Sequence, residues 1–244
     1  MAEKTQLTLY TDPRLTALGI VHGTTDRAWG NMRLPDSVQN LWQHTGLSSQ
    51  RILRFKQTHS DRLLVIREAK EAQAVIAATP TEADGWILSA AEWGAAIITA
   101  DCVPLFLWDE TADVIGLSHC GWRGVAAQLP AKTVRHLRQQ GAKGRLSAWI
   151  GPHIQACCFE VQEDVARQFP QAVLHKNDRL FVDLNQAIKQ QLIGEGLEAA
   201  DIAFSSHCTC CEPQHFFSFR RDHVPDAMLS FVYKPSCKQR TDFI

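Results

Sequence analysis

Residues 95–124 read AAIITADCVPLFLWDETADVIGLSHCGWRG. It contains three short apolar runs, at 95–99, 104–108 and 114–118, which predict three strands. The polar residues 109–113 between the last two runs suit the turn of a hairpin. We therefore expect antiparallel pairing at the centre of the fold, with polar motifs where the strands end.

Outward from this stretch, apolar runs typical of strands outnumber helical patterns. Further strands are predicted at 19–22, 51–56, 63–67, 85–88, 146–150, 202–205, 216–220 and 228–233. Apolar residues at helical spacing predict helices at 36–44, 125–140, 161–169 and 184–192. Single helices between strands predict one α/β catalytic domain, residues 1–244, built as a layered sandwich of mixed, mostly antiparallel sheets flanked by helices.

The composition limits the classes of partner. The chain has 244 residues, 45% of them hydrophobic, and a formal net charge of −1. So small a charge provides no long-range field, and we expect a small-molecule substrate, no nucleic acid and no membrane. No run is long and apolar enough to span a bilayer, and the first residues lack a secretory pattern, so we expect a cytoplasmic protein.

The chain contains eight cysteines. In a chain of this size they indicate reduced thiols rather than a disulfide framework. The adjacent pairs Cys157-Cys158 and Cys210-Cys211 are poorly placed to bridge within themselves. We expect most of these thiols to fill the core, where free cysteine is common.

Three residues, His59, Cys102 and His119, each stand in a short motif beside an apolar run. The motifs are QTHS at 57–60, TADCVP at 99–104 and SHCGWRG at 118–124. Two imidazoles and a thiolate are the ligands of a zinc that keeps one position open, whereas a structural zinc has four protein ligands. Taken singly, each motif also fits a simpler interpretation, such as a buried inert cysteine or a solvated loop histidine.

The segment after His119 predicts an anion pocket. Gly121 and Gly124 permit a tight turn and a close approach of the backbone to a ligand. The N–H groups of a helix starting here, together with Arg123, would suit a phosphate or a carboxylate. The alternative is an ordinary strand-to-helix turn in which Arg123 pairs with a surface acid.

Taken together, the motifs resemble the multicopper polyphenol oxidase (laccase) family, also described as zinc-type purine nucleoside phosphorylases and adenosine deaminases. The resemblance runs from about Val21 to the C-terminus, and it depends on the order of the motifs. In this chain they are Gln57-Thr58-His59, Ala83-Asp84, 99–104, 119–124, Gly151-Pro152-His153-Ile154 and 208–222.

The resemblance implies a fold like that of cytotoxic necrotizing factor-type cysteine hydrolases and a catalytic metal bound by His59, Cys102 and His119. It implies phosphorolysis of adenosine, inosine, guanosine and methylthioadenosine, with adenosine deamination as a second activity. The metal would be zinc, with copper as an alternative occupant because copper outranks zinc at nitrogen and sulfur sites. A metal-bound water, its pKa lowered toward ~7, would attack the purine C6 in deamination.

Other residues take supporting roles in this interpretation. The candidates for holding phosphate are Arg123, Arg27, Arg220 and Arg221. Asp101 and Asp84 are candidates for orienting the histidine ligands.

The chain also departs from the family pattern. Cys120 stands where alanine is usual, and residues 25–30 keep Arg27 but not the glycine pair that normally follows it. Residues 223–227 replace a glycine and a T-G-R motif, which weakens any substrate contact inferred from that loop.

Three other interpretations stay open. Cys102 could be the nucleophile of a metal-free cysteine hydrolase, with His119 as its base, acting on amides of peptidoglycan precursors. Cys208, Cys210 and Cys211 could form a structural zinc knuckle, with Cys237 as a candidate fourth ligand, although the spacing is cramped. A copper-dependent polyphenol oxidase with four coppers is disfavoured, because the ten histidines include no His-x-His pair.

Overall fold

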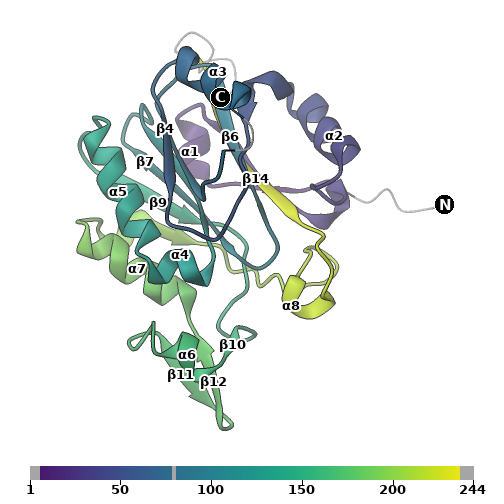
Figure 1. Ribbon diagram of the computed structural model, residues 1–244, viewed down its shortest axis with the longest axis vertical. Helices are drawn as coiled ribbons and strands as arrows, with labels where there is room; N and C mark the ends of the chain where they lie inside the picture. The colour runs from purple at the N-terminus through teal and green to yellow at the C-terminus, as the bar shows by residue number, and fades with distance from the viewer. Residues whose placement is uncertain (1–5, 79–80, 237–244) are drawn as a thin grey trace, which may run out of the picture.

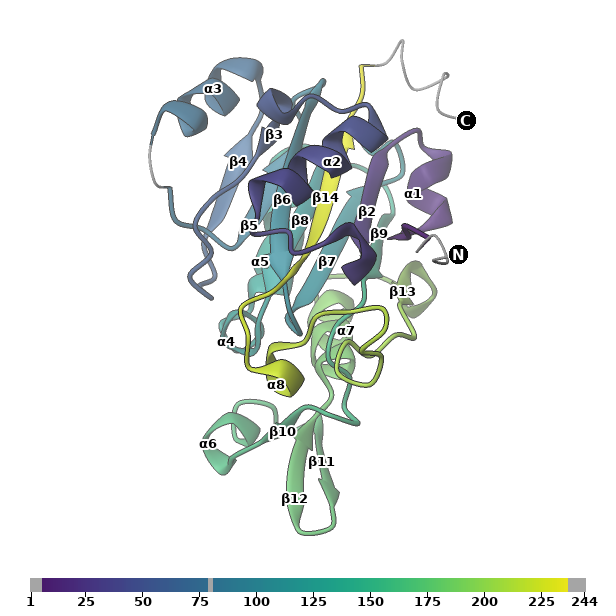
Figure 2. The same ribbon diagram turned by 90° about the vertical axis from the view of Figure 1, so that its right-hand side faces the viewer.

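Two β-sheets pack face to face at the centre of the molecule, and helices cover their outer faces (Figure 1). The computed structural model describes residues 6–78 and 81–236. A small third sheet projects from one end of the sandwich, next to helix α6 (Glu163–Ala166) (Figures 1 and 2).

The first large sheet has six strands in the order β13-β9-β7-β8-β5-β4. Its inner strands pair antiparallel, and each outermost strand joins its neighbour in parallel. The predicted hairpin is confirmed as β7 and β8, which pair from Val103 with Cys120 to Trp108 with Ile115. The strands are β4 (Leu63–Ile66), β5 (Gly85–Leu88), β7 (Val103–Asp109), β8 (Ile115–Cys120), β9 (Leu146–Ile150) and β13 (Ile202–Phe204).

The second large sheet has five strands in the order β1-β2-β14-β6-β3, in which the pairing of β3 with β6 is parallel and the other pairings are antiparallel. Its strands are β1 (Leu9–Tyr10), β2 (Val21–Thr25), β3 (Ile52–Leu53), β6 (Trp93–Thr99) and β14 (Met228–Lys234). The small antiparallel sheet consists of β10 (Glu160–Val161), β12 (Arg179–Val182) and β11 (Val173–Lys176).

Helices complete a four-layer sandwich. Helices α4 (Trp122–Ala126), α5 (Leu129–Gln139) and α7 (Leu184–Gly194) cover the six-stranded sheet, and α2 (Pro35–Thr45) covers the five-stranded one (Figure 1). The shorter elements are α1 (Pro13–Ala17), α3 (Ala69–Ala77), α8 (Phe219–Asp222) and the 3-10 turns Arg27–Trp29, Ser49–Arg51 and Ala199–Asp201. Within 6–78 and 81–236, no helix has the length and hydropathy that crossing a bilayer requires.

Strand alternation separates the apolar layers. In β7, Leu105 and Leu107 point toward the covering helices, whereas Phe106 and Trp108 point toward the other sheet. Successive side chains of a strand face opposite sides, so a strand covered on both faces reads as one continuous apolar run. Every residue of β7 is buried, which explains why residues 104–108 form a continuous apolar run in the sequence.

The predicted mixed α/β architecture is confirmed, and several predicted elements need correction. The helix predicted at 125–140 is two helices, because Gln128 adopts a left-handed conformation (φ 66°) and Pro130 lies in the first turn of α5. The strand predicted at 216–220 is wrong. Phe216 is buried there in a non-repetitive segment, and the Ser218 side chain accepts a hydrogen bond at the start of α8.

Candidate metal centre

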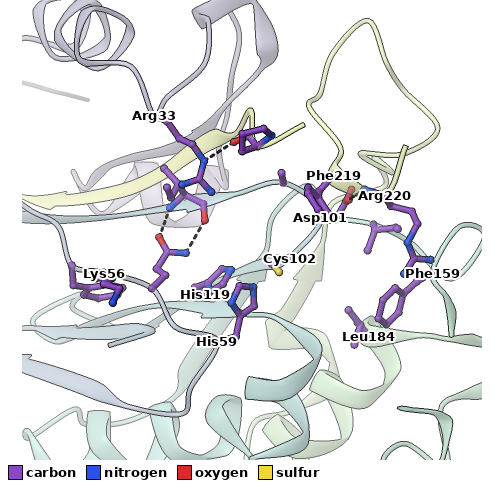
Figure 3. A pocket seen from close by; sticks show the side chains of 16 residues that line it. Arg33, Lys56, His59, Asp101, Cys102, His119, Phe159, Leu184, Phe219 and Arg220 are labelled. Atoms are coloured by element: carbon purple, nitrogen blue, oxygen red, sulfur yellow. Dashed lines mark hydrogen bonds between the residues drawn. The ribbon is translucent and has the colours of Figure 1, made fainter. Parts of the chain in front are cut away.

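His59, Cys102 and His119 meet where the chain passes between the two large sheets. His59 lies on the connection from β3 to β4, Cys102 on the connection from β6 to β7, and His119 near the end of β8. Their ligand atoms all lie within 4.8 Å of one another, and the side chains converge in Figure 3. One ion can therefore contact two imidazole nitrogens and a thiolate, so the donor set fits a tetrahedral metal with one open position.

Asp84 is fully buried and organises both histidines. Its Oδ1 accepts hydrogen bonds from His119 Nδ1 (2.8 Å) and from the backbone N–H of His59 (3.0 Å). Its Oδ2 accepts from the N–H and hydroxyl groups of Thr58 and Ser60. Because the carboxylate holds Nδ1, the Nε2 atom of His119 is left for a metal.

Gln57 ties the His59 loop to the five-stranded sheet. Its side-chain amide donates to the carbonyl of Ile98 (2.8 Å) and accepts from the N–H of Ile98 (2.7 Å), as a neighbouring strand would. His59 itself has a positive φ of 58°, a conformation that costs about 1–3 kcal/mol in a non-glycine residue. The Q-x-H spacing thus has a physical basis: the glutamine and Asp84 together hold the histidine in a strained turn.

Asp101 shapes the turn that presents Cys102. Its φ is 87°, and its carboxylate accepts hydrogen bonds from Thr209 Oγ1 (2.6 Å) and from the N–H of Arg220 (2.7 Å). Its carbonyl accepts from the N–H of Ile154 (3.0 Å). We expected Asp101 to orient a histidine, but its carboxylate instead fixes the segments that surround the Cys102 turn.

Gly121 provides the space that the ligands occupy. A Cβ atom at this position would lie 2.8 Å from His59 Cδ2 and 3.2 Å from Cys102 Sγ. Real side chains do not tolerate the first of these distances, so one ligand would have to move. The glycine of the H-x-G motif is therefore part of the site itself.

The site favours a thiolate at neutral pH. Burial alone would raise the pKa of the Cys102 thiol, but the imidazoles of His119 and His59 outweigh it and lower that pKa to about 6. Burial opposes protonation of His119, yet Cys102 and Asp84 raise its pKa to about 9. Against the opposing effect of burial, hydrogen bonds from His119 and Ser60 lower the pKa of Asp84 to about 2. A thiolate is the form of cysteine that binds metals and attacks electrophiles.

The three ligands line a cavity of about 550 Å³ (Figure 3). This volume lies within the range of sites for small organic ligands. Three aromatic and three cationic residues also line it: Phe55, Phe159, Phe219, Arg33, Lys56 and Arg220. The arrangement can enclose a planar ring and an anionic group beside a metal.

Of the four arginines suggested as phosphate ligands, Arg220 lines this cavity. Its Nη1 donates to the carbonyls of Glu160 (2.8 Å) and Cys158 (3.3 Å), and its guanidinium stacks over the ring of Phe159. These contacts fix the guanidinium in the cavity wall.

The other three arginines are placed elsewhere. Arg123 is exposed and stacks over Trp122, with 4.3 Å between its Cζ and the ring centre. Arg27 stacks over Phe217 and donates to a backbone carbonyl. Arg221 donates to three backbone carbonyls of its own loop and pairs with the adjacent carboxylate.

Sequence reasoning missed several residues of the cavity. Arg33, Lys56, Phe159 and Phe219 line it but belong to no motif with a recognisable ligand chemistry. Lys56 directly precedes the Q-x-H motif, and Phe219 lies beside Arg220. Proximity to a recognised motif was the available signal, and for Arg33 even that signal is absent.

The chain is similar in sequence and in fold to known proteins. Residues 32–233 match the family described as multi-copper polyphenol oxidoreductase laccase. Adenosine deaminase RL5 from an unknown prokaryotic organism is 32% identical over 209 residues, which cover 78% of this chain and 77% of that protein. A purine nucleoside phosphorylase of Deinococcus radiodurans is 35% identical over 234 residues, 86% of this chain and 87% of the relative. The crystal structure of YlmD from Geobacillus stearothermophilus superimposes with a TM-score of 0.84 at 25% identity, covering 97% and 98% of the two chains.

Proposed function

Because this chain belongs to the multi-copper polyphenol oxidoreductase laccase family, we propose that it is a metal-dependent purine nucleoside phosphorylase that also deaminates adenosine. One observation carries the proposal: two imidazoles and a thiolate converge on the wall of a cavity large enough for a nucleoside. Zinc suits this donor set, and copper is the alternative occupant.

The cavity lining supports a purine nucleoside as substrate. Phe159 and Phe219 offer rings on which a purine can stack, and Figure 3 places both on the same side as Arg220. Backbone carbonyls hold Nη1 of Arg220, and we assign the phosphate to its remaining N–H groups. Lys56 and Arg33 add positive charge on the opposite side.

The protein's own groups prepare both reactions. A divalent metal, when bound, supplies a Lewis acid beside the substrate. Asp84 fixes the ring of His119 through Nδ1, and the site holds Cys102 as a thiolate. In phosphorolysis, a phosphate oxygen positioned by Arg220 attacks the ribose C1′ as the bond to the purine nitrogen breaks. In deamination, water adds at the purine C6 and ammonia leaves, so no phosphate is consumed.

Product analysis with and without phosphate tests the proposal. The purified, zinc-loaded protein is incubated with adenosine. We expect adenine and ribose 1-phosphate when phosphate is present, and inosine when it is absent. The Cys102→Ala variant should lose both activities, whereas Cys210→Ser, whose thiol lies outside the cavity lining, should keep them. A zinc-replete protein that forms neither product contradicts the proposal.

A second candidate is a cysteine hydrolase that acts on amides of peptidoglycan precursors. The observation that favours it is the thiolate of Cys102. The neighbouring His119 stabilises this thiolate and lowers the pKa of the Cys102 thiol to about 6. A nucleophile and base so arranged are the groups that a cysteine hydrolase requires. Chelation separates the two schemes: the hydrolase would keep its activity without metal, and the phosphorylase would lose it.

A copper polyphenol oxidase lacks comparable support. Over the described residues, the histidines and cysteines that line the cavity are His59, Cys102 and His119, which is one site. Oxidation of a polyphenol by a four-copper mechanism would need the ligands of a further cluster.

A further inference from the structure

A second group of metal-ligating side chains lies outside the cavity. Cys157 and Cys158 occupy the turn between β9 and β10, and Cys208 and Cys211 occupy the turn that follows β13. All four sulfur atoms lie within 4.8 Å of one another. Four Sγ–Sγ distances are 3.7 Å (157–158), 3.6 Å (157–208), 3.5 Å (157–211) and 3.3 Å (158–211).

These distances match a single tetrahedral ion. Zinc–thiolate bonds of about 2.3 Å place the sulfurs of a regular tetrahedron roughly 3.8 Å apart. A disulfide would need about 2.05 Å, so no measured pair is bonded. In a four-iron cluster each cysteine binds a different iron, which spreads the sulfurs further apart. We propose that Cys157, Cys158, Cys208 and Cys211 bind one structural zinc ion.

The local backbone suits such a site. Cys208 and Cys211 have the two-residue spacing of a zinc knuckle, and a turn closes between them through Cys211 N–H to the Cys208 carbonyl (3.2 Å). The N–H of Gln155 donates to Cys208 Sγ (3.4 Å), a contact that stabilises a negatively charged sulfur. Cys208 is buried and Cys157 and Cys211 are exposed, so an ion can enter from solvent.

Nearby cations offset the charge of the site. Four thiolates and one divalent ion carry a net charge of −2. Arg221 donates to the carbonyl of Cys210, and Arg220 donates to the carbonyl of Cys158. Two guanidinium groups thus lie against the turns that carry the thiols, which reduces the cost of gathering negative charge there.

The ion would join two turns that hold residues of the cavity wall in place. The turn at 157–160 holds Arg220 through two carbonyls. The turn at 208–211 holds Asp101 through the hydroxyl of Thr209. With four protein ligands the site has no open position, so its role is to fix these turns and not to react.

This assignment revises the zinc knuckle considered from sequence. Cys208 and Cys211 remain as ligands, Cys157 and Cys158 complete the set, and Cys210 lies outside it. Cys237, the fourth ligand suggested earlier, lies outside the described residues. The site does not depend on the proposed catalytic activity, because none of its ligands lines the cavity.

Metal analysis of paired variants tests the proposal. All proteins carry Cys102→Ala to disable the first site and are purified with a reductant and without added metal. We expect one equivalent of zinc in this background, one with Cys210→Ser added, and none with Cys211→Ser added. Cys210→Ser is the matched control, because it removes a thiol from the same turn but outside the group of four. Equal zinc in the Cys210 and Cys211 variants overturns the proposal.

A second measurement covers the case in which Cys211→Ser does not fold. The Cys102→Ala protein, stripped of metal and loaded with Co²⁺, is examined by X-ray absorption and visible spectroscopy. We expect four sulfur neighbours and the intense charge-transfer bands of a tetrahedral thiolate site. Oxygen or nitrogen neighbours, or a disulfide found by mass spectrometry in place of metal binding, would overturn the assignment.

Discussion

The two groups of metal-ligating residues are connected through Asp101, yet they are built in opposite ways. The cavity site takes His59 and Cys102 from two separate strand connections and His119 from the end of β8, and it leaves one position open. The cysteine group takes two thiols from each of two turns and closes its tetrahedron. Both groups contain cysteine, so cysteine alone does not separate a reactive metal site from a structural one. The number of protein ligands does, because three leave a coordination position open and four do not.

Removal of a cavity ligand should have the largest effect, and it should affect the cavity site alone. Cys102→Ala or His119→Ala leaves two ligands, too few to hold a dehydrated cation, so zinc affinity at this site should fall sharply. A lost Lewis acid is worth several kcal/mol, which corresponds to a fall in phosphorolysis of roughly 10³-fold or more. Assays and metal analysis should show that the cysteine group keeps its ion. Full zinc occupancy at both sites after dialysis against chelator would mean that the ligand set is wrong.

Gly121→Ala tests whether space at the cavity site is as restricted as the distances indicate. The added methyl group would lie 2.8 Å from His59 Cδ2, and relief of that overlap costs about 1–3 kcal/mol. We expect zinc affinity at the cavity site to fall by roughly ten- to a hundredfold. Gly194→Ala is the control, since its Cβ meets nothing within 4 Å. Equal metal affinity in the two variants would refute the steric argument.

Asp84→Asn tests the carboxylate that orients His119. The amide keeps the size of the side chain but removes its charge, and loss of such a partner usually weakens metal binding by about ten- to a hundredfold. Competition with a chelating dye measures this change. The cysteine group has no contact with Asp84 among the hydrogen bonds of the described residues, so its ion should be unaffected. A parallel loss of both ions would show that Asp84 stabilises the fold as a whole.

Arg220 links the two regions, because it lines the cavity and donates to the carbonyl of Cys158. A hydrogen bond to a charged group contributes about 1.5–3 kcal/mol, so Arg220→Ala should raise the KM for phosphate roughly tenfold or more. Adenosine deamination, which consumes no phosphate, should change little. Arg123→Ala provides the test of the sequence-based expectation, because Arg123 lies exposed over Trp122. If the KM for phosphate rises with Arg123→Ala and not with Arg220→Ala, the phosphate position proposed here is wrong.

The smallest effect concerns a buried histidine, His22, that belongs to neither group. His22 accepts a hydrogen bond at Nε2 from the N–H of Asp12 (2.9 Å), and burial lowers its pKa. The unfolded chain therefore binds a proton below the ordinary pKa of about 6.5 that the folded protein rejects, and stability falls as the pH falls. The slope amounts to at most about 1.4 kcal/mol per pH unit. Urea titrations should show this slope reduced in His22→Gln; an unchanged slope would assign the acid sensitivity to other groups.

Local patterns were sufficient for parts of the fold and of the cavity site. The β7–β8 hairpin was predictable because a strand buried on both faces is continuously apolar. His59, Cys102 and His119 were predictable because each stands in a motif of unusual composition. The break before α5 also has a local signal, because Pro130 stands inside the helix predicted at 125–140, whereas the left-handed conformation of Gln128 has none.

The complete ligand set of the cysteine group could not be predicted from local sequence patterns. The expectation that most thiols fill the core is wrong, because among the described cysteines only Cys120 and Cys208 are buried. Nothing near Cys157 and Cys158 in the sequence indicates Cys208. What brings them together is the bridge between His153 and Cys208, a pairing across 55 positions that only the folded chain creates. Phe159 and Arg33 enter the cavity in the same way, through tertiary packing without a motif.

The connections from β3 to β4 and from β6 to β7 both run from the five-stranded sheet to the six-stranded one. His59 and Cys102 lie on segments that leave one sheet and enter the other, whereas His119 belongs to the six-stranded sheet alone. An ion held by all three would act as a cross-link that resists sliding of one sheet over the other. Because ligands that bind only the folded state raise its stability, metal loading should stiffen the whole sandwich. The candidate metal centre would then also stabilise the packing of the two sheets.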